Sequence, residues 1–316
     1  MLIANPIYDS VFKYLMEDLR VAKVIIQTII GQKIEELEIT PRERTAQIPS
    51  LGLTVFRLDF SAVVLTAEGH RRNVLIELQK ADGGNDIRRF RRYLAENYYA
   101  GSAARLAAPR VREDPDDCAD QPPLLPIISI YILGYPLPGL QGHSAVTVAR
   151  TYRDSVTGEE IPARVDFIEC LTHDSHVIQL SELNRRRRSK LEKMLALFEQ
   201  MNLQRNEHLK EFSDEMPGEF KEALDRLGQA ALDRNLLEQM ELEDEVLTAW
   251  KQRERKNDQS LAEAHAREQE AQAREQEAQA REQEERRQKE EERRQKEEAL
   301  AELARLRAEL AARTKP

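Results

Sequence analysis

A continuous apolar run near the middle of the chain constrains the fold most strongly. Residues 124–134 read LLPIISIYILG, and no charged residue interrupts them. A strand that shows one face to water alternates apolar and polar residues, whereas a strand covered on both faces does not. The run therefore predicts a strand in the interior of a sheet, with a layer of other elements on each side.

Helical and strand-like segments alternate around this run. Apolar residues recur at helical spacing over residues 8–30 and stop at Gly31, which predicts one amphipathic helix with Asp9 or Ser10 near its N-cap. Strand, turn and helix signals predict the other elements: a strand from about 33 to Pro41, a hairpin of strands 53–66 and 72–81 turning at Glu68-Gly69-His70, a helix over 86–108, and strands at 144–152 and 163–171 flanking a turn at Thr157-Gly158. This order predicts an α/β sandwich over residues 1–180.

The remainder of the chain is expected to be helical. Residues 181–250 show helical periodicity in two stretches, which predicts a small all-α region. Residues 251–316 form a third region, a charged helical tail of low complexity. The sequence thus predicts three parts, with boundaries after residues 180 and 250.

The tail is built on a repeat of seven residues. AREQEAQ occurs at 266–272 and again at 273–279, and related heptads follow. Four pairs are spaced for i,i+4 attraction: Glu270 with Arg274, Glu277 with Arg281, Arg286 with Glu290, and Arg293 with Glu297. The alanines recur at spacings of five and two, unlike the three and four of a coiled-coil seam. The pattern therefore favours a solvated single helix over 264–298, with a short leucine stripe only at its end.

Charge and composition narrow the class of protein. The net charge is −9, and it belongs entirely to residues 1–250, because residues 251–316 carry 17 basic and 17 acidic groups. An acidic body is not typical of a general nucleic-acid binder, so an anionic partner would need a local basic patch. We find no apolar run long enough for a membrane span and no signal-peptide pattern, and the two cysteines lack metal-ligand spacing. These features favour a reduced, cytoplasmic protein that does not enter a membrane.

Three polar residues interrupt the apolar strands of the predicted hairpin. Glu77 and Gln79 lie two apart and share one face of their strand, and Asp59 can reach that face if the strands pair across the 67–71 turn. Burial of a carboxylate is costly unless a charge or hydrogen bond meets it. Two carboxylates and an amide oxygen suit Mg²⁺, with Mn²⁺ or Ca²⁺ as alternatives. The alternative is that Glu77 and Gln79 face solvent on an edge strand.

The same stretch resembles a known nuclease family. Asp, about eighteen residues, and then Glu-x-Gln on a strand resembles the PD-(D/E)XK nuclease superfamily. Five motifs, in order, are similar more narrowly to the Rpn family of recombination-promoting nucleases and putative transposases: NPIYDSVFKYLM, RLDFSAVV, VLIELQKA, DIRRFRRYLAENYY and PIISIYILGYPL. The resemblance covers roughly residues 5–180. It implies a restriction-endonuclease-like core, a mixed sheet flanked by helices.

The resemblance also implies roles for individual residues. Asp59 and Glu77 take the metal-ligand positions, and Gln79 stands where the superfamily name has lysine. Lys80 is adjacent but is expected on the opposite face, so Lys13 on the first helix is the preferred charge donor. Asp9 matches the acid of that helix and either binds metal through water or only caps the helix. Lys13 has the alternative of being ordinary surface charge.

A basic helix follows the hairpin. Residues 71–112 hold ten basic and four acidic groups, and Arg88, Arg91, Arg92 and Tyr93 are candidates to grip a phosphate backbone. The alternative is a solvated helix face. His173-Asp174-Ser175-His176 has no third ligand at metal-site spacing, which favours a polar turn. Arg185–Arg188 either contacts nucleic acid or begins an exposed helix.

These patterns lead to two competing functions. The resemblance implies a Mg²⁺-dependent DNA endonuclease, linked to recombination or mobile elements, that hydrolyses phosphodiester bonds without a covalent intermediate. The alternative is an inactive nuclease fold used as a binding module. Under either hypothesis, the helical C-terminal half could assemble a homodimer.

Overall fold

The computed structural model of the chain describes residues 1–40, 43–48, 53–58, 60–80, 86–100, 124–183, 188–204 and 207–313. Over 43–48 and 53–58, and at some positions of the helices, the description covers the backbone alone. The chain divides into two units, Met1–Thr248 and Ala249–Pro316. The candidate site belongs to the first unit.

The first unit is built on a mixed sheet of six strands. In spatial order these are β2 (Ile34–Ile39), β5 (Phe60–Thr66), β6 (Arg71–Gln79), β7 (Ile127–Leu133), β11 (His173–Gln179) and β8 (Ala145–Val148). β2, β5 and β6 are antiparallel neighbours, β6, β7 and β11 run parallel, and β8 is antiparallel to β11. The predicted α/β class with a mixed sheet is confirmed.

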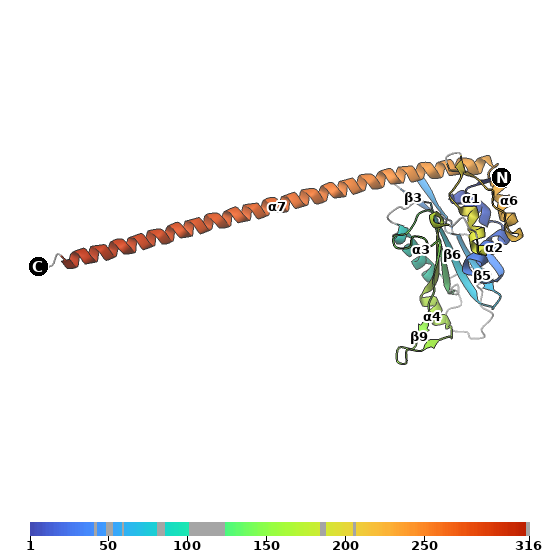
Figure 1. The fold of residues 1–316 in the computed structure, drawn as a ribbon, viewed down its shortest axis with the longest axis horizontal. Helices are drawn as coiled ribbons and strands as arrows, with labels where there is room; N and C mark the ends of the chain where they lie inside the picture. Colours follow the sequence, from blue (N-terminus) through green and yellow to red (C-terminus); the bar gives the residue numbers. More distant parts are fainter. Residues whose placement is uncertain are drawn as a thin grey trace. The chain divides into compact units, whose positions relative to one another are not determined.

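β7 is the interior strand that the apolar run predicts. It pairs in parallel with β6 on one side and with β11 on the other. All of its residues are buried except Tyr131, which is half-buried. Figure 1 shows helices α1 and α2 on one side of the sheet and α3 (Asp86–Ala100) on the other, so β7 is covered on both faces.

Two helices stand where the apolar periodicity predicts one over 8–30. They are α1 (Asp9–Met16) and α2 (Leu19–Ile30). Asp18 separates them, because its carboxylate accepts hydrogen bonds from two backbone N–H groups of α2, at 2.9 and 3.3 Å. A side chain that caps the second helix in this way ends the first. α2 stops as predicted at Gly31, whose φ of 69° suits glycine.

The main hydrophobic core lies between the sheet and the α1–α2 pair. The Phe12 ring of α1 meets the Phe60 ring of β5 edge-on, with 6.4 Å between their centroids. The same cluster contains Val74, Ile76 and Leu78 of β6. Successive side chains of a strand point to opposite faces. The odd-numbered residues of β6, which include Glu77 and Gln79, therefore lie on the other face of the sheet.

The predicted hairpin is present in β5 and β6. The turn between β5 and β6 has Gly69 at φ 83°, and the Gly69 N–H donates to the Thr66 carbonyl at 2.9 Å. The residues before it form β4 (Leu53–Leu58), which pairs with β3 (Glu43–Ile48) in a sheet of its own. Both described parts of the strand expected over 53–66, on either side of residue 59, are extended, and they pair with different strands.

Residues 144–179 differ most from the pattern-based expectation. Helix α4 (Asp166–Leu171) replaces the strand expected over 163–171. The segment 173–176, expected to be a polar turn, is the start of β11, because pairing with β7 and β8 satisfies its backbone groups. β9 (Tyr152–Arg153) and β10 (Glu160–Ile161) do flank a turn, with Gly158 at φ 77°.

Residues 181–248 are not all-α, and the predicted helical region is wrong in this respect. The segment contains η2 (Leu180–Glu182), α5 (Lys190–Leu195), η3 (Ala196–Phe198), β12 (Leu203–Gln204), β13 (Leu209–Glu211), η4 (Gly218–Phe220), α6 (Lys221–Ala230) and the start of α7 (Arg234–Arg313). β13 pairs with β12 and with β1 (Leu2–Ala4), at the beginning of the chain. β1 needs a partner for its backbone groups, and β13 supplies it.

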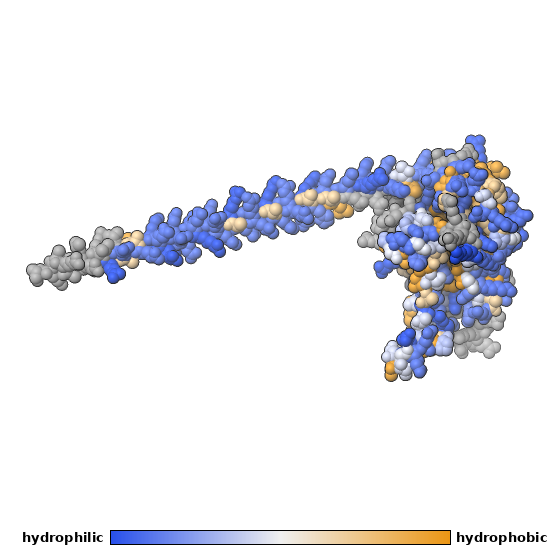
Figure 2. Space-filling view, in the orientation of Figure 1, coloured by the Kyte–Doolittle hydropathy of each residue, from blue (hydrophilic) through white to orange (hydrophobic). Residues whose placement is uncertain are grey.

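The second unit consists of the continuation of α7. From Lys251 on, its side chains are exposed where they are described, and Figure 2 shows a surface that is mostly hydrophilic. Three of the expected i,i+4 pairs form: Glu270–Arg274 at 2.6 Å, Glu277–Arg281 at 2.6 Å and Arg293–Glu297 at 3.5 Å. Arg286 instead meets Glu282, at 2.7 Å. The expected helix over 264–298 is confirmed, and three of the four expected charge pairs form; its solvation as a single helix stays a prediction.

Within the described ranges, no helix combines the length and apolarity that crossing a membrane requires.

Candidate functional site

The odd-numbered residues of β6 lie on the sheet face that α3 covers, and all of them except Leu75 are polar. Glu77 and Gln79 are both half-buried there, while Ile76 and Leu78 point into the main core. Glu77 is level with Tyr131 of β7 in the parallel ladder. Burial raises the pKa of the Tyr131 hydroxyl, and the negative charge of Glu77 raises it further. The shared face predicted for Glu77 and Gln79 follows from this register.

α3 is held over this face by three contacts along its length. The Phe90 ring stacks on Tyr131, with 4.7 Å between centroids and 29° between planes. Farther along, Asn97 accepts a hydrogen bond from the Asn73 amide at 3.5 Å. The Tyr98 hydroxyl lies 2.6 Å from His173 Nδ1. The predicted basic helix therefore lies above the strand that carries Glu77.

Several hydroxyls and amides of this face were missed by the sequence reasoning. Ser61 donates to Asn73 Oδ1 at 3.1 Å, and Ser129 donates to the Ser175 hydroxyl at 2.8 Å. Small polar residues every second position within apolar strands are the signal that could have found them. They make the sheet face under α3 more polar than the face that packs against α1 and α2.

The other candidates for the catalytic centre are not all brought together. Asp59 lies outside the described residues, so its pairing with Glu77 stays a prediction. Lys13 belongs to α1, which packs on the Ile76 side of the sheet. Asp9 is the first residue of α1, and Tyr8, rather than Asp9 or Ser10, occupies the N-cap position.

The nucleic-acid candidates on α3 are described only in part. Arg91 is exposed, while the side chains of Arg88, Arg92 and Tyr93 lie outside the description. Exposed positions recur every four residues along α3, at Ile87, Arg91, Ala95 and Tyr99. A stripe of this spacing forms one outward face of a helix. Of the basic run before α5, Arg185–Arg187 are not described, and Arg188 is exposed.

The donor atoms of the face suit a hard cation. The Glu77 carboxylate and the Gln79 amide oxygen project from the same side of one strand, and oxygen atoms of this kind are the ligands that Mg²⁺ prefers. Among the residues that the structure describes, no group of three His, Cys, Asp or Glu side chains gathers to hold an ion. The two oxygens fit part of a magnesium site, and the predicted third ligand is Asp59.

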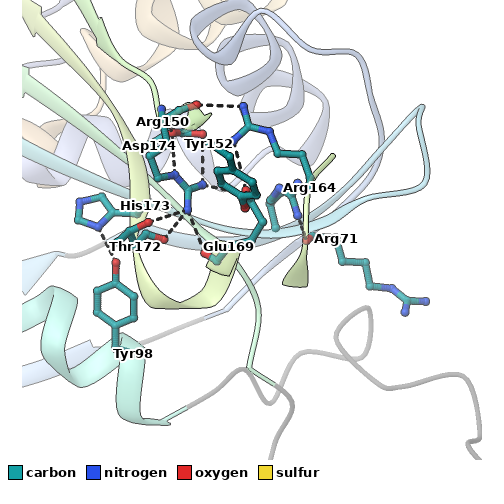
Figure 3. Close-up of polar contacts among 10 residues, drawn as sticks. Arg71, Tyr98, Arg150, Tyr152, Arg164, Glu169, Thr172, His173 and Asp174 are labelled. Atoms are coloured by element: carbon teal, nitrogen blue, oxygen red, sulfur yellow. Dashed lines mark hydrogen bonds and ion pairs between the residues drawn. The ribbon is translucent and has the colours of Figure 1, made fainter. Parts of the chain in front are cut away.

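A second polar cluster surrounds Arg150, between β8 and β9 (Figure 3). Its guanidinium donates to Glu169 at 2.8 Å and to Asp174 at 2.9 Å, and it also reaches the Thr172 carbonyl at 2.9 Å. Arg164 approaches the same Glu169 carboxylate at 3.2 Å. The carboxylates of Glu169 and Asp174 are both paired with Arg150, so the cluster fastens α4 to β11.

A third cluster lies at the end of β6, on the side opposite to Glu77. The Lys80 ammonium donates to the Tyr8 hydroxyl at 2.5 Å and to Asp244 at 2.8 Å. Lys80 is also 3.3 Å from Glu207, and His208 Nε2 lies 2.9 Å from Asp244. The expected separation of Lys80 from the face of Glu77 is confirmed, because Lys80 meets Tyr8, the N-cap residue of α1.

No family model, curated protein or solved structure matches the chain. Any function proposed for it therefore rests on its own residues and geometry.

Proposed function

We propose that the first unit is a metal-dependent DNA endonuclease whose centre lies on the α3 side of β6. Glu77 and Asp59 would hold Mg²⁺ or Mn²⁺ through carboxylate oxygens, with the Gln79 amide oxygen beside them. The single observation that carries the proposal is the placement of Glu77 and Gln79 together on a polar sheet face under the basic helix. The five motifs of the nuclease resemblance also fall on neighbouring elements: α1, β5, β6, α3 and β7.

The chemistry follows from the charges of this face. A bound divalent ion would lower the pKa of an attacking water and neutralise the phosphodiester as charge develops. Glu77, half-buried beside Tyr131, would keep its carboxylate oriented toward the ion. Arg91, exposed on α3, would contact a backbone phosphate and fix the register of the DNA without reading its sequence. Water would displace the leaving oxygen in one hydrolytic step.

A binding module without catalytic activity remains the second candidate, and one observation favours it. Lys13 and Lys80 both come from the Ile76 side of the sheet, and Lys80 is already paired with Asp244. Neither lysine is positioned by its element to orient an attacking water at Glu77. Gln79, an uncharged residue, would have to serve in that position.

A plasmid-nicking assay separates the two functions. Wild-type protein, Asp59→Ala and Glu77→Gln would be compared in Mg²⁺, Mn²⁺ and Ca²⁺, with Glu36→Gln as a control for loss of an exposed carboxylate. We expect wild type and Glu36→Gln to nick DNA in Mg²⁺ or Mn²⁺ and the two site variants to lose at least about a hundredfold in rate. Wild-type protein that binds DNA without cutting it in any of these ions would identify the binding module.

A further inference from the structure

Two acidic residues near the start of α7 reach across the first unit to α1 and β6. Glu243 accepts hydrogen bonds from the backbone N–H groups of Asp9 and Ser10, each at 2.9 Å. These are orphan donors of the first turn of α1, so a carboxylate from a distant helix caps it. Asp244, the next residue, binds the Tyr8 hydroxyl at 2.9 Å and the Lys80 ammonium at 2.8 Å.

The network around Asp244 is closed to water on one side only, because the side chains of Lys80 and Asp244 are 20% and 32% exposed. Tyr8 is 1% exposed and His208 is 4% exposed, and their rings meet edge-on at 5.2 Å. Burial opposes ionisation of Asp244, but hydrogen bonds from Lys80, His208 and Tyr8 outweigh it and lower the pKa of this carboxyl. Hydrogen bonds to a charged group in such surroundings are stronger than neutral ones. The network is therefore a firm link between α7 and the residue that follows β6.

The end of β6 is also held by the backbone of the residue that follows β7. The Gly134 N–H donates to the Gln79 carbonyl at 2.8 Å. A Cβ at position 134 would lie 2.4 Å from the Lys80 carbonyl oxygen, so only glycine allows this approach. Gln79 thus sits between a backbone contact with Gly134 and the ion pair that Lys80 makes with Asp244.

We infer that the Lys80–Asp244 pair positions the end of β6 and, through it, the side chains of Glu77 and Gln79. Lys80 and Asp244 are positioning residues, since they lie on the opposite side of the strand from the metal ligands. The part of this inference that concerns activity rests on the proposed nuclease function. A change at residues 243–244 of α7, such as displacement by a bound partner, would then alter metal binding on the far face of the sheet.

Amide hydrogen exchange tests the positioning without reference to activity. The full-length variants Asp244→Asn and Tyr8→Phe would be compared with Glu238→Gln, which removes an exposed α7 carboxylate that meets only Arg234 in the described structure, at 2.9 Å. Gly134 reports on the end of β6, and the Asn73 N–H, bonded to the Pro126 carbonyl at 2.9 Å, reports on its beginning. We expect exchange at Gly134 to quicken by about tenfold in Asp244→Asn and less in Tyr8→Phe, with Asn73 unchanged.

Nicking kinetics give the second readout. Loosened ligands bind the ion more weakly, so the Mg²⁺ concentration for half-maximal nicking should rise about tenfold in Asp244→Asn. A mere loss of folded protein would instead lower the rate at every Mg²⁺ concentration without moving that midpoint. Unchanged exchange at Gly134, or equal quickening at Gly134 and Asn73, would overturn the inference. Faster exchange at Gly134 alone in a protein whose wild type never nicks would overturn the proposed function and leave the positioning role standing.

Discussion

Glu169 is buried with its carboxylate 2.8 Å from the Arg150 guanidinium. Arg150 also pairs with Asp174 at 2.9 Å, so it joins helix α4 to strand β11. The Tyr152 hydroxyl donates to the Glu169 carboxylate at 2.5 Å. A buried carboxylate of this kind depends on its partners, because the cost of its desolvation is offset only while they are in place.

Replacement of Glu169 by Gln should destabilise the first unit by about 3 kcal/mol, because Arg150 and Arg164 would lose their buried counter-charge. Urea unfolding of the full-length protein at pH 7 measures the change. Glu159→Gln, at an exposed position of the neighbouring hairpin, is the matched control and should be near neutral. A loss below about 1 kcal/mol would show that the cluster contributes no more than an exposed ion pair.

The same cluster should make the protein sensitive to acid. Burial opposes ionisation of Glu169 and Asp174, but hydrogen bonds and charges from their partners outweigh it, so the pKa of each is lowered. A carboxyl with a lowered folded pKa adds stability above its unfolded pKa of about 4, and the gain is lost as the pH falls through the folded pKa. The urea midpoint should therefore drop between about pH 5 and pH 2. The drop should be smaller in Glu169→Gln, and an identical pH profile for the two proteins would contradict the assignment.

Replacement of Arg88, Arg91 and Arg92 together by Ala should weaken DNA binding and flatten its dependence on salt. If each arginine contacts one phosphate, the plot of log binding constant against log salt concentration should become less steep by about 2.7. Fluorescence anisotropy with a labelled duplex over a salt series measures this slope. Replacement of Arg267, Arg274 and Arg281 by Ala removes the same charge from the tail and should leave the slope unchanged. Equal slopes for all three proteins would mean that the α3 face is merely solvated.

Truncation after Trp250 should leave nicking activity and thermal stability nearly unchanged. The cut keeps Glu243 and Asp244, which bind α1 and Lys80 within the first unit. The removed i,i+4 pairs contribute only about 0.2–0.5 kcal/mol each to their own helix. Melting curves, nicking rates and sedimentation of the truncated and full-length proteins provide the comparison. Loss of cleavage, or conversion of a dimer to a monomer, would show that the tail is an assembly element.

In a crystal structure with Mn²⁺, the carboxylates of Asp59 and Glu77 should lie within about 3–6 Å of each other and share one ion. The anomalous signal of Mn²⁺ identifies the ion and its ligands. An Asp59→Ala crystal grown in the same way should lose that signal. Carboxylates on opposite faces of the sheet would exclude the shared site.

The sequence alone predicts the elements whose structure depends on residues close to one another in the chain. The apolar run of β7 indicates burial on both faces, and Gly31 ends α2 because it adopts a positive φ. The alternation of β6 placed Glu77 and Gln79 on one face and Lys80 on the other. The tail is also local, since neighbours three and four residues apart supply its ion pairs.

Tertiary structure alone decided the elements that depend on distant partners. Residues 173–176 read as a polar turn, yet they form a strand because β7 and β8 supply backbone partners and Arg150 pairs with Asp174. The strands β12 and β13 interrupt an expected helical region because β1, some two hundred residues earlier, pairs with β13. Glu243 caps α1 across a similar separation. No local pattern predicts these contacts. A buried backbone group must find a hydrogen-bond partner, and here that partner comes close only when distant parts of the chain have packed together.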